Sequence, residues 1–217
     1  MPWYMVLAML IFSAVIYFAN WVQGLYCLRA LGLAWLATVG FLALTQPGLL
    51  RRRRLAPKEG PTSPEWDSRI LGYLRVSLLL VLAVAGWETG RGDTPFDAEL
   101  FGYGAGLLVF GTLVMWASFR SNPFFETGVR HQAEQGQRVV QTGLYSRVRH
   151  PGYLAMIFML ASLPVMLHSG AAVLPWALCV GVLVARLQRE EAYLVTHLEG
   201  YADYRQRVPF RLIPYLW

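Results

Sequence analysis

Long apolar runs alternate with polar segments along the chain of 217 residues. A helix needs about 20 mainly apolar residues to cross the hydrocarbon core of a bilayer. Six runs approach this length, so we expect an all-α, polytopic integral membrane protein with six transmembrane helices. The predicted spans are 3–23, 25–46, 70–90, 98–118, 152–168 and 171–187. The last two spans are separated by only two residues, Ser169 and Gly170, which predicts a C-terminal helical hairpin.

The composition supports a membrane protein, because 56% of the residues are hydrophobic and only 15% are charged. Soluble domains carry about 25% charged residues. The first charged residue is Arg29, so the N-terminal run lacks the basic segment that opens a cleavable signal peptide. We therefore expect the first span to stay in the protein.

Of the 19 lysine and arginine residues, 16 fall in three segments: 47–69, 119–150 and the tail from Arg186 onward. With six spans, these segments lie on one side of the membrane. The positive-inside rule then places them and both termini in the cytoplasm, which in a bacterium makes the host membrane the inner one. Contact with anionic headgroups accounts for their charge, so we expect no nucleic-acid partner.

The chain divides into two predicted regions. Residues 1–118 form a transmembrane scaffold of four helices, with 47–69 as a connector without helical periodicity, and 119–217 hold most of the candidate chemistry. Gly102 and Gly106 are spaced for close helix packing in lipid. The four histidines and two cysteines show no metal-ligand spacing, so we expect no metal site.

The sequence RHPGY at 149–153 places two basic residues in front of an apolar span. The residue before a proline avoids helical geometry, and proline suits a first helical turn, so the helix should begin at Pro151 with His150 just outside it. The free N–H groups of that turn form a seat for an anionic group. Ordinary interface residues explain the motif equally well when it is taken alone.

The sequence RLQREEAYL at 186–194 places charges at the end of the last span. Arg186 and Glu190 lie on one helix face, and the simplest interpretation is an ion pair worth a few tenths of a kcal/mol. A charge that emerges from an apolar span must be paired or functional, which favours a site. Because Glu191 faces another direction, we expect Glu190 in the site and Glu191 in a solvated, structural role. The tail after 199 is predicted to be an interfacial segment able to fold back under the hairpin.

Together the two motifs resemble those of the isoprenylcysteine carboxyl methyltransferase family and its phospholipid methyltransferase relatives. The elements G-x-Y-x-x-x-R-H-P-x-Y and R-x-x-x-E-E followed by leucine are present at 143–153 and 186–194. The resemblance runs over about 120–217, on both sides of a hairpin of suitable length. This chain departs from the family pattern at Gln137, where relatives usually have a histidine.

The resemblance implies a methyltransferase that binds S-adenosyl-L-methionine at the cytoplasmic end of the hairpin and takes its acceptor from the membrane. Arg186 and Glu190 are the implied catalytic residues, with Arg186 toward the acceptor and Glu190 on the cofactor. The other implied cofactor-binding residues are Gln132, Gln137, Arg138, Val139, Val140, Tyr145, His150, Pro151, Gly152 and Tyr153.

Direct methyl transfer needs alignment and exclusion of water rather than a covalent intermediate. An arginine fork suits a carboxylate, which is ionised at pH 7 and needs no base, so we favour a prenylcysteine-like or lipid-like carboxylate as acceptor. A phospholipid amine, a small thiol and a non-catalytic lipid-binding scaffold remain alternatives. A transporter is disfavoured because the spans hold almost no polar residues near their centres. The oligomeric state is left open.

Overall fold

The computed structural model describes residues 21–45, 64–91, 96–126, 128–129, 132 and 136–217. This part of the chain contains six α-helices, one short 3-10 helix and no strand, as the all-α prediction requires. The elements are α2 (Trp21–Thr45), α4 (Glu65–Arg91), α5 (Ala98–Ser121), η2 (Gly143–Ser146), α6 (Pro151–Met166), α7 (Val173–His197) and α8 (Tyr201–Arg207).

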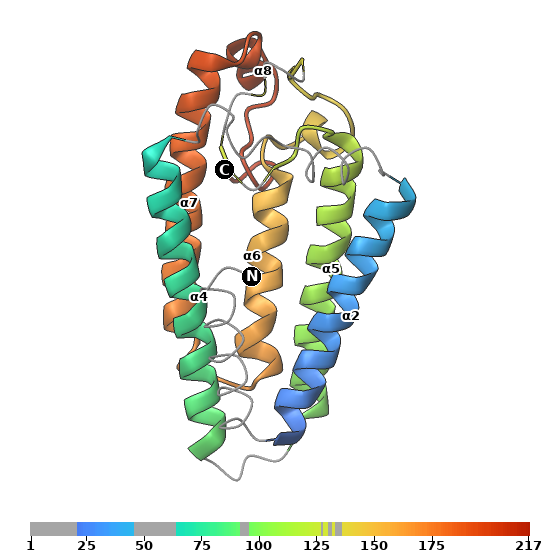
Figure 1. Ribbon diagram of the computed structural model, residues 1–217, viewed down its shortest axis with the longest axis vertical. Coiled ribbons are helices and arrows are strands. Elements are labelled where there is room, and N and C mark those ends of the chain that lie inside the picture. The colour runs from blue at the N-terminus through green and yellow to red at the C-terminus, as the bar shows by residue number, and fades with distance from the viewer. Residues whose placement is uncertain (1–20, 46–63, 92–95, 127, 130–131, 133–135) are drawn as a thin grey trace.

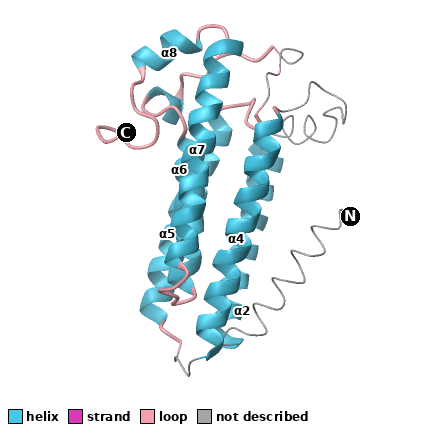
Figure 2. Cartoon of the chain, turned by 90° about the vertical axis from the view of Figure 1, so that its left-hand side faces the viewer, coloured by secondary structure: helices cyan, strands magenta, loops and turns pink. Residues whose placement is uncertain are grey.

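The five long helices form an elongated bundle in which α6 lies between α5 and α7, while α2 packs on α5 and α4 packs on α7 (Figure 1). The short helix α8 and the C-terminal tail gather at one end of this bundle (Figure 2). We call this the α8 end. There α4 and α6 begin and α5 and α7 finish, so segments that are distant in the sequence meet.

Three helices are long and apolar enough to cross a membrane: Gly24–Thr45, Glu65–Gly90 and Ala98–Ser121. They contain most or all of the spans predicted at 25–46, 70–90 and 98–118, and α6 adds a shorter apolar helix. Large apolar side chains such as Leu33, Trp35 and Trp87 remain exposed on the bundle, as a lipid-facing surface requires. These helices support an integral membrane protein. The predicted span 3–23 lies almost wholly outside the described residues, and the total of six spans and the orientation stay predictions.

The predicted connector 47–69 is wrong for its last residues, because α4 begins at Glu65. The Asp67 N–H donates to the Pro64 carbonyl oxygen at 2.8 Å, and the acidic side chains of Glu65 and Asp67 suit the positive end of a helix dipole. The hairpin prediction is correct, but α7 continues past 187 to His197. Helices α4 and α7 therefore reach farther toward the α8 end than their apolar runs indicate.

The close contact between α5 and α6 depends on glycines other than those predicted. Within the described part of the chain, a Cβ atom at Gly102 or Gly106 would meet nothing within 4 Å, so this pair does not form the contact between α5 and α6. A Cβ at Gly104 would lie 2.7 Å from the Met166 N atom, and one at Gly111 would lie 2.9 Å from the Ala155 O atom. Glycine spacing did not identify Gly104 and Gly111, because residue size alone does not tell which face of α5 meets α6.

Candidate active site

A cavity of about 390 Å³ lies at the α8 end of the bundle, within the size range of small-molecule sites. Its wall includes parts of all five long helices and α8, and the segment after α5. Polar and aromatic side chains line the part near the helix ends. Deeper in the bundle, the lining is mainly apolar and includes Leu71, Leu74, Met115, Phe119, Met156 and Met159.

The start of α6 has the predicted form, with His150 at the N-cap position and Pro151 in the first turn. The main-chain N–H groups of Arg149 and His150 donate to the carbonyl oxygens of Phe210 and Arg211, both at 2.9 Å. The tail thus folds back against the segment that precedes α6. These two N–H groups are used by the protein itself rather than left for an anion.

Gly152 lets an aromatic ring lie directly on the first turn of α6. A Cβ at this position would come within 2.5 Å of the Phe125 ring. Both residues line the cavity. The small residue in RHPGY therefore has a packing reason that the sequence alone does not show.

The expectation that Glu191 is solvated is wrong, since it is only 3% exposed. Its Oε1 atom lies 2.5 Å from Arg149 Nε and 3.2 Å from His150 Nε2, and its Oε2 accepts from Arg211 Nε at 2.7 Å. Burial opposes ionisation of this carboxyl, but the bonds to His150, Arg149 and Arg211 outweigh it and hold the pKa of Glu191 below its ordinary value. Helical spacing gave the direction of Glu191 but not the tail that covers it.

Glu190 lines the cavity, and its Oε2 accepts a hydrogen bond from the Tyr153 hydroxyl at 2.5 Å. The same hydroxyl accepts from Arg186 Nη1 at 3.0 Å, so Tyr153 bridges the two charged residues of α7. Arg186 is buried and forms a salt bridge to Asp67, with Nε 2.9 Å from Oδ1. The predicted relation between Arg186 and Glu190 is therefore mediated by a third side chain.

Asp67 is the main site residue that the sequence did not reveal. It is fully buried, and its second oxygen accepts from the Val129 N–H at 2.9 Å. It thereby joins the start of α4 to α7 and to the segment after α5. The signal was available in Pro64 followed by two acids, which is typical of a helix start. The division into 1–118 and 119–217 stays a prediction, and the cavity has lining residues from both sides of it.

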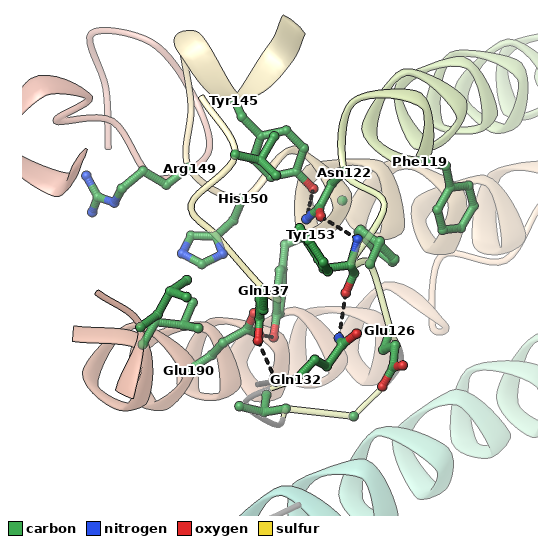
Figure 3. A pocket seen from close by; sticks show the side chains of 18 of the residues that line it. Phe119, Asn122, Glu126, Gln132, Gln137, Tyr145, Arg149, His150, Tyr153 and Glu190 are labelled. Carbon is green, nitrogen blue, oxygen red and sulfur yellow. Dashed lines mark hydrogen bonds between the residues drawn. The ribbon is translucent and has the colours of Figure 1, made fainter. Parts of the chain in front are cut away.

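The segment after α5 is folded by amide side chains. Gln132 Nε2 donates to the Phe124 carbonyl oxygen at 2.8 Å, and Gln137 Oε1 accepts from the Gln132 N–H at 2.7 Å (Figure 3). Asn122 Oδ1 accepts from the Phe124 N–H at 2.9 Å, and Asn122 Nδ2 donates to the Tyr145 hydroxyl at 3.4 Å. The amide at position 137 thus closes a turn against the main chain, a contact in which its oxygen is the acceptor.

Tyrosine hydroxyls from the tail complete the wall. Tyr204 donates to the Tyr145 carbonyl oxygen at 2.7 Å, and the Tyr201 hydroxyl lies 3.4 Å from His150 Nε2. Burial raises the pKa of Tyr145, Tyr201 and Tyr204, so these hydroxyls stay protonated at neutral pH. The tail folds back as predicted and brings Tyr201 and Tyr204 to the cavity, although the sequence did not identify these two tyrosines as site residues.

The structure brings nearly all of the sequence-predicted site residues to this one cavity. Pro151 is the exception, since it is buried in the first turn of α6 and does not line the cavity. The Arg149 guanidinium points away from Gln132 and Gln137 (Figure 3). Its Nε atom donates to Glu191 Oε1 instead. The predicted residues that line the cavity are Gln132, Gln137, Arg138, Val139, Val140, Tyr145, His150, Gly152, Tyr153, Arg186 and Glu190.

Part of the chain matches a known protein family. Residues 104–196 match the model of the isoprenylcysteine carboxyl methyltransferase (ICMT) family, and this region contains both sequence motifs and the α6–α7 hairpin. A search of curated proteins found no match. The family is one of methyltransferases, in agreement with the resemblance of the two motifs. Over residues 104–196, the chain is therefore similar to the isoprenylcysteine carboxyl methyltransferase family.

Proposed function

We propose that this protein transfers a methyl group from S-adenosyl-L-methionine to a lipophilic acceptor that reaches the site from the membrane. One observation carries the proposal: the two family motifs, which lie on different helices, contribute His150, Tyr153, Arg186 and Glu190 to a single cavity. That cavity joins a polar part near the helix ends to an apolar part within the bundle. Such a combination suits a polar cofactor and a lipid-like acceptor in one site.

The side chains of the polar part fit the cofactor. S-Adenosyl-L-methionine carries a sulfonium, an amino-acid group and a flat purine. The Glu190 carboxylate suits the cationic groups, and the rings of Tyr145, Phe124 and Phe125 suit the purine faces. Within the described part of the chain, the main-chain amides of residues 138–140 make no hydrogen bond, and they suit the polar edge of a purine. Gln132, Gln137 and Tyr145 hold this wall in place.

When bound, the cofactor supplies a methyl group on a positively charged sulfur. The protein's task is then to bind, align and exclude water. Glu190 binds the cationic part, and Tyr153 orients that carboxylate through their hydrogen bond. Tyr201, Tyr204 and the tail cover the cavity from the α8 end, and the apolar lining keeps water from the deeper part.

The acceptor is a carboxylate of a prenylcysteine-like or lipid-like molecule. The apolar part of the cavity takes the hydrocarbon chain, and Arg186 supplies positive charge where this part meets Glu190. A carboxylate is already ionised at pH 7, so no proton has to be removed before transfer. A phospholipid amine or a small thiol is the second candidate, because Asp67 offsets the charge of Arg186 and lessens its pull on an anionic acceptor.

The test is binding of S-adenosyl-L-methionine to the purified full-length protein by calorimetry, with and without added lipid. Wild-type protein should bind with micromolar affinity, and Glu190→Gln and His150→Ala should lose that binding. Glu199→Gln is the matched control, since it removes an exposed carboxylate that does not line the cavity, and it should bind like wild type. Folded wild-type protein that fails to bind under both conditions would overturn the proposal and leave a lipid-binding scaffold.

Transfer of a labelled methyl group then separates the acceptors. A prenylated cysteine carboxylate, a phospholipid with a primary amine and a small thiol are offered in parallel. The proposal expects methylation of the prenylated carboxylate, and its loss in Arg186→Gln. Methylation of the amine or thiol alone would replace the carboxylate by the second candidate.

A further inference from the structure

Arg186 has carboxylates on two sides, one on another helix and one on its own. Its Nε donates to Asp67 of α4, while Glu190 lies one turn farther along α7. Oppositely charged residues at this spacing on a helix attract each other directly. In this protein the Tyr153 hydroxyl occupies the position between them, accepting from Arg186 and donating to Glu190.

Asp67 is held firmly enough to fix Arg186. Its side chain is fully buried, and both oxygens are engaged, Oδ1 by Arg186 and Oδ2 by the Val129 N–H. A buried ion pair keeps its geometry only when such additional bonds satisfy the remaining lone pairs. Asp67 also lies outside residues 104–196, so the family match assigns it no part in the site.

We propose that Asp67 is a positioning residue of the cofactor site, which draws the Arg186 guanidinium to α4 and so leaves the Glu190 carboxylate available to a cationic ligand in the cavity. This inference rests on the proposed function, because it takes Glu190 as the group that binds the cofactor. It also gives the N-terminal region a direct part in the site.

Loss of the Asp67 charge changes the balance at Arg186. The guanidinium is buried and needs a carboxylate, and Glu190 is within its reach on the same helix face. An arginine bound in this way makes charge-assisted hydrogen bonds that cancel the charge of Glu190. A cationic ligand then has to compete with Arg186 for the same carboxylate.

The experiment measures the affinity of the full-length protein for S-adenosyl-L-methionine by calorimetry, in three forms: wild type, Asp67→Asn, and Asp67→Asn with Arg186→Gln. Asparagine keeps an oxygen that accepts from Val129, so the contact with the segment after α5 is retained. Asp67→Asn should weaken binding by about tenfold or more, and the double variant should return to within about threefold of wild type, because it lacks the competing cation. Asp203→Asn, at an exposed position on α8, is the matched control and should not change the affinity.

The pattern of results separates this inference from the proposed function. Wild-type affinity in Asp67→Asn overturns the inference and leaves the cofactor site intact. Equal weakening in the single and double variants also overturns it, since Asp67 then supports only the fold. Wild-type protein that does not bind removes the proposed function and this inference with it.

A second comparison applies if Asp67→Asn does not fold. Asp67→Asn is then combined with Arg186→Lys and, separately, with Arg186→Gln. Lysine keeps a cation one helical turn from Glu190, so the lysine form should bind the cofactor about fivefold or more weaker than the glutamine form. Equal affinities in these two forms would overturn the inference.

Discussion

Both ends of the bundle use buried or half-buried carboxylates, but they use them differently. At the end opposite α8, Glu88 of α4 accepts from the Ser169 hydroxyl at 2.5 Å and from the Ala171 N–H at 2.9 Å. These bonds fasten the turn between α6 and α7 to a helix that already packs on α7. At the α8 end, Glu191 joins the RHPGY segment to the tail, and Asp67 joins α4 to α7.

The two ends differ in whether a carboxylate remains available to a ligand once the contacts within the protein are made. The opposite end closes on itself and serves stability. At the α8 end, Glu191 and Asp67 hold the wall together, while Glu190 stays on the cavity surface with Tyr153 as its hydrogen-bond donor. We therefore expect Glu190 to serve ligand binding and the adjacent Glu191 to serve stability.

The largest effect on stability is expected from Glu191→Leu. This change leaves the buried Arg149 and His150 without their carboxylate, and breaking such a cluster costs about 3–5 kcal/mol. Thermal and denaturant unfolding measure the loss. Glu190→Gln is the neighbouring control, and it should lose cofactor binding while its unfolding midpoint stays close to that of wild type. Equal stability of the two variants would contradict the expectation that Glu191, and not Glu190, stabilises the fold.

Acid should also destabilise the fold through the cluster of Glu191, Arg149 and His150, by less than Glu191→Leu does. Because the folded-state pKa of Glu191 lies below its ordinary value of 4.5, the unfolded state binds the proton first as the pH falls. The stabilisation is fully present above the ordinary value and is lost progressively below it. Melting temperatures measured from neutral to acidic pH should fall less steeply below about pH 4.5 in Glu191→Gln than in wild type. Parallel curves would mean that the charge of Glu191 does not stabilise the fold.

The sequence predicted the parts of the site that local chemistry determines. Proline geometry located the start of α6, and apolar length located the hairpin. The two motifs identified His150 and Glu190, which do line one cavity. These features depend on neighbours in the chain, so spacing and residue type are sufficient to find them.

The parts that were missed depend on what lies opposite a residue in space. Helical periodicity showed that Glu191 faces away from Glu190, but not that the tail carrying Arg211 covers it. The lack of helical periodicity in 47–69 predicted a connector, so Asp67 was not recognised as the partner of Arg186, which lies far along the chain. Glycine spacing likewise did not tell that Gly104 rather than Gly102 meets α6. Tertiary packing decides each of these.

Gly104→Ala should give a moderate loss of stability at the opposite end. Its new methyl group would press on the main chain of Met166, and overpacking of this kind costs about 1–3 kcal/mol. Gly102→Ala has open space and should be neutral or stabilising by about 0.5–1 kcal/mol, because alanine favours a helix. Unfolding midpoints of both variants give the comparison, and a destabilised Gly102→Ala with a stable Gly104→Ala would reverse the assigned faces of α5.

Ser169→Ala should give the smallest effect. It removes the hydrogen bond to Glu88 and the acceptor of the Ala172 N–H, together worth about 1–2 kcal/mol, while the Ala171 N–H keeps its bond to the same carboxylate. The affinity for S-adenosyl-L-methionine should stay at the wild-type value, because the change lies at the end of α6 away from the cavity. Ser146→Ala, which removes an exposed serine hydroxyl at the α8 end, is the control for loss of a hydroxyl. If Ser169→Ala weakened cofactor binding, the turn between α6 and α7 would be coupled to the site along the helices, and the opposite end would have a part in function beyond stability.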